Sequence, residues 1–175
     1  RPRAEGPPAR GGGTDGVRSD ALLDAGTGRA LRELARTGGT TLYTALLAAY
    51  QAVLHRWSGE SDIVVGSPVV NRGRTEFEDV VGNFGNTVIL RTDLTGAETF
   101  RALVARTRDT CADAFAHQDI PFERVVEALR PADAVGEAPL FDVVFSFVTE
   151  ESRRVTTPTV SFAEQPHHNG TARFP

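Results

Sequence analysis

The sequence predicts an α/β domain in which helices are layered on a sheet. The clearest helical signal covers residues 43–57, where apolar side chains recur at intervals of three and four. Two short apolar runs, residues 62–68 and 88–90, instead have the composition of strands buried on both faces. Such helices and buried strands alternate along the chain, which indicates the layered α/β class.

Composition places the chain among ordinary globular proteins. It has 175 residues, 40% of them hydrophobic and 24% charged, which is enough for one domain with a core. The net charge of -4 and the lack of a lysine-rich run argue against nucleic-acid binding. No apolar run reaches the ~18 residues needed to span a bilayer. The chain has no methionine and begins with Arg1, so we expect it to be a piece of a longer protein.

The first half is expected to contain a linker, two helices and a strand. Residues 1–20 are rich in Pro, Gly and Arg and predict an extended linker, followed by one domain over residues 21–175. Residues 27–37 predict a helix that ends at Gly38-Gly39, with three side chains facing inward: Ala30, Leu31 and Leu34.

The next helix and strand are better defined. Thr40 or Thr41 is the expected N-cap of the helix over residues 43–57, which ends at Ser58-Gly59. Its apolar face is expected to comprise Tyr43, Leu46, Leu47, Tyr50, Val53, Leu54 and Trp57. A buried strand over residues 62–68 follows, and residues 71–79 read as a loop.

Residues 80–91 predict a tight polar turn that leads into a strand. Gly82 and Gly85 would supply backbone freedom, while Asn83 and Asn86 can bond to neighbouring main chain and tolerate left-handed torsions. The spacing of Thr95 and Glu98 then predicts a capping box. It would open a helix whose apolar side holds Phe100, Leu103, Val104, Cys111 and Phe115.

A further helix is expected to begin near Pro121, with Phe122, Val125, Val126 and Leu129 on one face. Residues 130–139 predict a loop. Residues 140–148 predict a long strand, and a weaker strand is expected through Val160 and Phe162. On the long strand one face would carry Phe141, Val143, Phe145 and Phe147.

Five segments in a fixed order carry a resemblance to a known family. They are LLAAY (46–50), DIVVGSPVVNR (62–72), VGNFGNTVILR (81–91), HQDIPFE (117–123) and PLFDVVF (139–145). Together they closely resemble the C-terminal half of the condensation domain of nonribosomal peptide synthetases. The resemblance covers residues 22–149 and, more weakly, the segment up to Phe174.

The resemblance implies a fold like that of chloramphenicol acetyltransferase, with two α/β lobes in a V, a mixed sheet in each and a tunnel between them. It implies amide-bond formation between a donor and an acceptor, each bound as a thioester to the phosphopantetheine arm of a peptidyl carrier protein. The implied partners are these two carrier proteins and the N-terminal lobe of the same domain. No cofactor or metal would be bound, and neither nucleic acid nor membrane would be a partner.

The family's His-His-x-x-x-Asp-Gly motif has no match in this chain. His167-His168 is followed by Asn-Gly-Thr-Ala-Arg, and the chain stops at Phe174-Pro175 where the family continues into another strand and helix. We therefore expect one lobe, incomplete at both ends and truncated before its last strand and helix. No residue here would be catalytic, and the chain alone would be inactive.

The resemblance also assigns roles to individual residues. Arg72 would pair with the Asp of the missing motif, although it could instead be a solvated arginine beside Arg74. Tunnel-lining roles would fall to Asn83, Asn86, Thr87 and Phe145, or the first three would only form a turn. Structural motif positions would be Gly82, Phe84, Gln118, Asp119, Pro121, Phe122, Glu123, Pro139 and Phe141.

Other reactive residue types have simpler explanations. His117 is expected to cap the helix that precedes it, and Asp119 to cap the helix that follows. Cys111 is the only cysteine, lies on an apolar helix face, and is expected to be a small buried hydrophobe in a reducing, cytoplasmic compartment. His167-His168 is expected to be part of an exposed tail and not a metal site.

Two other functional classes stay open. One is a degenerate, non-catalytic module that recruits carrier proteins or a tailoring enzyme. The other is a coenzyme-A-dependent acyltransferase of the same fold, whose usual Asp-Phe-Gly-Trp-Gly stretch is replaced here by Asn83-Phe-Gly-Asn-Thr87. The sequence does not identify the amino acids joined, the donor stereochemistry, or a condensing, cyclising or epimerising subtype.

Overall fold

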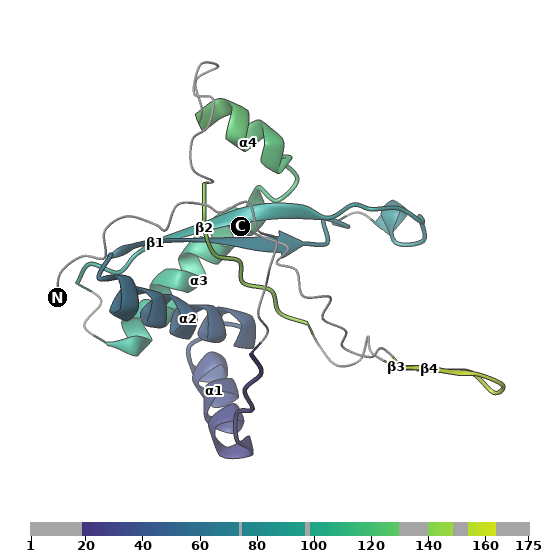
Figure 1. Ribbon diagram of the computed structural model, residues 1–175, viewed down its shortest axis with the longest axis horizontal. Coiled ribbons are helices and arrows are strands. Elements are labelled where there is room, and N and C mark those ends of the chain that lie inside the picture. Colours follow the sequence, from purple (N-terminus) through teal and green to yellow (C-terminus); the bar gives the residue numbers. More distant parts are fainter. Residues whose placement is uncertain (1–18, 74, 97–98, 130–139, 149–153, 164–175) are drawn as a thin grey trace. The chain divides into compact units, whose positions relative to one another are not determined.

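The computed structural model describes residues 19–73, 75–96, 99–129, 140–148 and 154–163 (Figure 1). Contacts divide the chain into two units. One is Leu23–Phe147, and the other combines Arg1–Leu22 with Val148–Pro175. The predicted loop over residues 130–139, with Pro139, lies outside the described residues.

Helix α1 spans Ala25–Thr37 and begins before the predicted residue 27, because Asp24 is its N-cap. The Asp24 carboxylate accepts a hydrogen bond from the Thr27 amide at 2.9 Å. Leu31 and Leu34 are half-buried as expected, but Ala30 is exposed and Ala35 is buried instead. The prediction for Ala30 is wrong because α1 contacts only α2 among the described elements, so it buries a narrow stripe.

Helix α2 spans Leu42–Ser58. Its N-cap is Thr41, whose hydroxyl accepts from the Thr44 amide at 3.2 Å, and its C-cap is Gly59 with a φ of 78°, so both predicted ends are confirmed. The predicted burial of Val53 and Trp57 is wrong, since they are 60% and 85% exposed. The helix packs against α1, α3 and β1, and these contacts leave Val53 and Trp57 uncovered by described residues.

Strand β1 spans Asp62–Val69 and pairs antiparallel with β2, Asn86–Asp93, in the register that sets Asp62 opposite Asp93 and Val69 opposite Asn86. Both predicted strands are confirmed. The expectation that β2 is buried on both faces is wrong, because Val88, Leu90 and Thr92 are buried while Ile89 is only half-buried and Arg91 is exposed. Helix α3 packs on β2 and α2 on β1, which covers one face of the pair.

Residues 140–148 do not form the predicted long strand. They make one parallel bridge, in which the Gly66 amide donates to the Val143 carbonyl and the Phe145 amide donates to the Gly66 carbonyl, both at 2.9 Å. The next bond of a parallel ladder would come from Pro68, which has no N–H. The Ser67 hydroxyl donates to the Phe145 carbonyl instead, at 2.9 Å. The ladder therefore stops, and the sheet is the antiparallel β1–β2 pair with one isolated parallel bridge at Gly66.

Helix α3 spans Phe100–Ala116, and its N-cap is Thr99, which accepts from the Ala102 amide at 3.2 Å. The capping box predicted at residues 95–98 would make Thr95 the N-cap, and this is wrong because the N-cap is Thr99. The Thr95 amide is bonded to the Asp93 carboxylate at 2.8 Å, and Gly96 has a φ of 68°, so this segment turns before the helix begins. Residues 97–98 are outside the described part.

The remaining elements are short. A 3₁₀ turn, η1, covers Thr75–Phe77 inside the predicted loop, and helix α4 covers Phe122–Leu129 as predicted. In the other unit, β3 (Arg154–Thr156) and β4 (Ser161–Ala163) form an antiparallel hairpin. The predicted weak strand is confirmed at Phe162, which lies in β4, whereas Val160 precedes it. No helix in the described ranges is long and apolar enough to cross a membrane.

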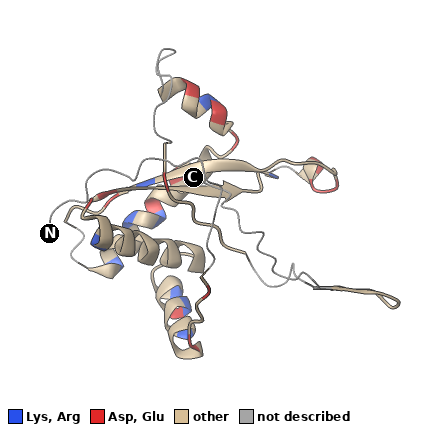
Figure 2. Ribbon diagram, in the orientation of Figure 1, with Lys and Arg blue, Asp and Glu red and all other residues tan. Residues whose placement is uncertain are grey.

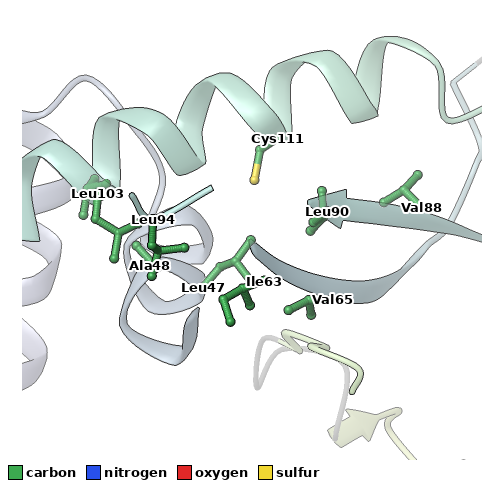
Figure 3. Close-up of a cluster of buried hydrophobic side chains, with 10 residues drawn as sticks. Leu47, Ala48, Ile63, Val65, Val88, Leu90, Leu94, Leu103 and Cys111 are labelled. Atoms are coloured by element: carbon green, nitrogen blue, oxygen red, sulfur yellow. The ribbon is translucent and has the colours of Figure 1, made fainter. Parts of the chain in front are cut away.

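The core lies between the sheet and helices α2 and α3. Figure 3 shows Cys111 pointing from α3 toward the strands, among Leu47, Ile63 and Leu90. Helix α2 carries no acidic residue and, of Lys and Arg, only Arg56, in keeping with its central position (Figure 2). A polar network is buried beside this core: Gln51 donates to Thr92 and accepts from Thr107, each at 3.0 Å.

Among the described glycines, Gly66 has the least room for a side chain. A Cβ built there would lie 2.5 Å from the ring of Phe141. We expect Gly66→Ala to lower the free energy of unfolding by about 1–3 kcal/mol, because the ring must leave its place over the strand. Urea unfolding followed by circular dichroism measures the change.

Gly73→Ala is the matched control, since no atom lies within 4 Å of a Cβ built at Gly73. Its unfolding midpoint should stay close to that of the unchanged protein. Equal midpoints for the two variants would contradict the packing of Phe141 over Gly66.

Candidate functional site

A pocket of about 430 Å³ lies where the end of β1 meets the start of β2 and the start of α4. It brings together three of the sequence segments singled out above, residues 62–72, 81–91 and 117–123. Its lining comprises Pro68, Val69, Asn71, Asn83, Gly85, Asn86, Thr87, Asp119, Pro121, Phe122 and Glu123. Three of the four predicted tunnel residues therefore line one cavity: Asn83, Asn86 and Thr87.

Asn86 joins residues 81–91 directly to residues 117–123. Its side-chain Nδ2 donates to the carbonyls of Gln118 at 2.8 Å and Ile120 at 2.7 Å, and its Oδ1 accepts from the Phe122 amide at 3.0 Å. The first amide of α4 is thus bonded to Asn86 and not to Asp119, so the predicted capping role of Asp119 is wrong. Asp119 is exposed and contributes to the pocket wall.

Arg72 braces the loop that leads into the pocket. Its Nη1 donates to the carbonyls of Phe77 and, at 2.9 Å, Val80, while Nη2 donates to Gly82 at 3.0 Å. The guanidinium also lies 4.4 Å from the ring centroid of Phe84. Arg72 is therefore half-buried and bonded to its own loop, which excludes the solvated alternative. Its pairing with an external carboxylate stays a prediction, and Arg74 is outside the described residues.

The turn at residues 82–86 is built differently from the prediction. Among the described glycines, positive φ angles occur at Gly39, Gly59 and Gly96, so neither Gly82 nor Gly85 uses left-handed freedom. Asn83 closes the turn by accepting from the Gly85 amide at 2.9 Å. A Cβ on Gly85 would lie 3.1 Å from that same oxygen, which is a tight contact.

Left-handed backbone does occur nearby, but at Asn71, with a φ of 51°, and not at Asn83 or Asn86. Asn71 lines the pocket and was not singled out by sequence reasoning. A single Asn after a strand gives little sign of which torsion it adopts.

The aromatic residues of the predicted long strand lie elsewhere. Phe145, a predicted tunnel residue, is not among the residues that line this pocket, and its ring centroid lies 5.3 Å from Tyr43 and 5.8 Å from Tyr50. Phe141 lies over Gly66 and contacts Phe122, with ring centroids 5.7 Å apart. Phe145 therefore packs against the core, whereas Phe141 supports the pocket wall through Phe122. Phe84 likewise packs on Phe77, at 5.2 Å between centroids.

The pocket offers carboxylates, amides and a hydroxyl. Asp119 and Glu123 supply negative charge, and Asn83, Asn71 and Thr87 supply donors and acceptors. Such a lining can hold a polar or cationic group by hydrogen bonds. Among the residues that line it there is no histidine and no cysteine, so a nucleophile activated by an imidazole is not built here.

His117 and Cys111, the reactive side chains nearest in sequence to the pocket residues, have structural roles. His117 is the C-cap of α3, and its Nδ1 lies 2.9 Å from the Asp113 carbonyl, as predicted. Cys111 is buried on the inner face of α3, and this burial raises the pKa of its thiol to about 11. The prediction of a small buried hydrophobe is confirmed. His167 and His168 lie outside the described residues.

Comparisons with known proteins point to one family. The family model described as "Condensation domain" matches residues 5–175. A linear gramicidin synthase of Brevibacillus parabrevis is 51% identical over 116 residues, which is 66% of this chain and 2% of that protein. The phosphinothricin tripeptide synthetase PhsC of Streptomyces viridochromogenes is 39% identical over 164 residues, which is 92% of this chain and 15% of that protein.

Solved structures agree with this. The condensation domain of the monacolin K polyketide synthase MokA matches with a TM-score of 0.63 and 30% identity, over 71% of this chain and 29% of that one. The X-domain from teicoplanin biosynthesis, solved in complex with OxyB, matches with a TM-score of 0.63 and 29% identity, over 70% and 27%. The chain spans only a small part of each of these proteins.

Arg72→Lys tests whether the three hydrogen bonds of the Arg72 guanidinium order the loop over residues 77–85. Lysine keeps the charge but cannot reach three carbonyls while stacking on Phe84. We expect faster hydrogen exchange over residues 77–85, measured by mass spectrometry. Arg56→Lys, at an exposed position on α2, is the control and should leave this segment unchanged. Equal exchange in both variants would contradict the bracing role.

Cys111 should be almost inert in the folded protein. With a pKa of about 11 the thiol stays protonated at pH 8, so the nucleophilic thiolate is scarce. We expect negligible reaction with a chromogenic disulfide reagent at pH 8, and stoichiometric reaction after addition of denaturant. Rapid reaction without denaturant would contradict the burial of Cys111.

Proposed function

Because the chain belongs to the condensation-domain family of nonribosomal peptide synthetases, we propose that it is the C-terminal lobe of such a domain and takes part in amide-bond formation. The family match over residues 5–175 carries this proposal. It is supported by the five sequence segments in the family's order and by the meeting of three of them at one pocket.

In the proposed reaction, the amine of an acceptor aminoacyl thioester attacks the carbonyl of a donor thioester. The carbon–nitrogen bond forms, the carbon–sulfur bond breaks, and the proton lost by the amine is balanced by protonation of the leaving thiolate. Both thioesters are carried on phosphopantetheine arms of peptidyl carrier proteins. The main task of the domain is then to hold two tethered reactants in register, which makes their effective concentration high.

The part assigned to this lobe is one wall of the substrate channel. Asn83, Asn86 and Thr87 line the pocket with Asp119 and Glu123, so hydrogen bonds and negative charge are available to an incoming amine or to the amides of the arm. The pocket lining contains no histidine that could accept the proton of this amine. We assign proton handling to a His-His-x-x-x-Asp-Gly motif in the N-terminal lobe, because no such motif occurs among these 175 residues.

The two histidines within the described residues support that division of labour. The ring Nδ1 of His55 lies 2.6 Å from the Glu60 carbonyl, and that of His117 is bonded within α3. Arg72 is the proposed link to the other lobe. Its three bonds to the loop use three of the five guanidinium N–H groups, which leaves donors for the Asp of the missing motif.

A second candidate is a non-catalytic module that recruits a partner enzyme. The observation in its favour is the similarity to the teicoplanin X-domain, whose structure was solved as a complex with OxyB. The similarity is about as strong as that to the MokA condensation domain. In this case the same lobe would present a binding surface, and the complete domain would lack condensation activity.

The decisive experiment compares this chain with the complete domain. Donor and acceptor carrier proteins loaded with aminoacyl thioesters are incubated with each, and the amide product is measured by mass spectrometry. We expect product with the complete domain and none above the uncatalysed rate with residues 1–175 alone. Turnover by the isolated chain would overturn the assignment of proton handling to the other lobe.

The same assay separates the two candidates. Arg72→Ala in the complete domain should lower the rate by roughly tenfold to a hundredfold, as misplacement of a catalytic motif does. A complete domain that binds carrier proteins but forms no product would favour the recruiting module.

A further inference from the structure

The side-chain amide of Asn86 makes three hydrogen bonds to residues 118–122. Both N–H groups of its amide are bonded to carbonyls and its oxygen to an N–H, which fixes the orientation of the amide. The bonded groups belong to three residues within one short turn: Gln118, Ile120 and Phe122. A neutral side chain with a donor and an acceptor at this length is required, and asparagine is the residue that has them.

Helix α4 depends strongly on this contact. None of its residues is fully buried, and β2 is the only described helix or strand with which it shares contacts. The ring contact between Phe122 and Phe141 adds one apolar support. Few apolar contacts therefore hold the turn before α4 in place, and the three bonds of Asn86 are the polar part of its attachment.

The same turn is a wall of the pocket. Asp119, Pro121, Phe122 and Glu123 line the cavity and are contiguous with the backbone groups that Asn86 holds. The opposite wall is made by the start of β2, from which Asn86 itself extends. Its side chain thus sets the separation between two walls of one cavity.

We propose that Asn86 is the positioning residue that sets the width of this pocket, and through it the placement of the carrier-bound substrate. The inference rests on the proposed function. Asn86 does not act on the reacting atoms in this account; it holds residues 118–123 at the distance where they can contact the substrate.

Asn86→Asp is the sharpest test because it changes one group. The retained oxygen can still accept from the Phe122 amide, but the second oxygen would face the carbonyls of Gln118 and Ile120, which lie 2.8 and 2.7 Å from the present Nδ2. A carboxylate is repelled there, and its pKa is raised. The protonated acid can donate to one of the carbonyls, so acidification should restore part of the contact.

The experiment measures amide formation by the full-length synthetase with its own carrier-bound substrates, at pH values from about 8.5 to about 6. At the high end we expect kcat/KM of the Asn86→Asp protein to be roughly tenfold to a hundredfold below that of the unchanged protein. The ratio of the two should rise as the pH falls. Asp119, Glu123 and His117, the other ionisable side chains of this segment, are present in both proteins.

Thr99→Asp is the matched control. It introduces the same side chain at the N-cap of α3, where a carboxylate is favourable, beyond the end of β2 opposite Asn86. Its activity ratio should stay constant over this pH range. A ratio for Asn86→Asp that is flat, whether low or equal to one, would overturn the proposal.

Hydrogen exchange of the unchanged full-length synthetase gives a second, independent test. The Phe122 amide is at the start of a helix, where amides usually lack intrahelical partners and exchange quickly. Its bond to Asn86 should make it slow to exchange, and fast exchange would overturn the proposal even if the Asp variant failed to fold. If the unchanged synthetase formed no amide product, the proposed function would fail while slow exchange of Phe122 would still support the contact.

Discussion

The antiparallel pairing of β1 with β2 is the constraint on which the rest of this lobe depends. Its register sets Val69 opposite Asn86 at one end and Asp62 opposite Asp93 at the other. One face is buried under α2 and α3, so a shift by one residue would turn Val88, Leu90 and Thr92 away from the core. The same register delivers Asn86 and Thr87 to the pocket. Core packing and site geometry are therefore set by one set of strand contacts.

Polar contacts inside the core make this arrangement specific. Gln51 of α2 is fully buried and bonds to Thr92 of β2 and Thr107 of α3, so one side chain joins three elements. Buried polar groups are costly unless all are satisfied, which happens here in only one relative placement of the three. At the other side of β1, Tyr43 approaches Ser67 at 2.7 Å, and Ser67 bonds to the Phe145 carbonyl. These contacts hold residues 143–145 beside β1, although their hydrogen-bond ladder with β1 ends there.

The sequence predicts local features of this fold well and distant contacts poorly. Caps at Thr41 and Gly59 and the strands around Val65 and Leu90 follow from residue type and spacing, which act over a few residues. The long strand at residues 140–148 could not be ruled out locally, because what ends it is Pro68, many residues earlier. The site shows the same division. Its residues were predicted from motif resemblance. The backbone groups to which Asn86 bonds depend on tertiary contacts that no local pattern contains. The same holds for the packing of Phe145 against Tyr43 and Tyr50.

The bridge from Asn86 to Phe122 has a consequence for the design of hybrid synthetases. Residues 86 and 118–122 satisfy each other's hydrogen bonds, and Phe122 in turn packs on Phe141. A recombination junction placed between these segments would combine halves that were never selected to fit. If the fusion points lie outside residues 66–145, then Asn86, helix α4 and Phe141 are exchanged together from one parent protein.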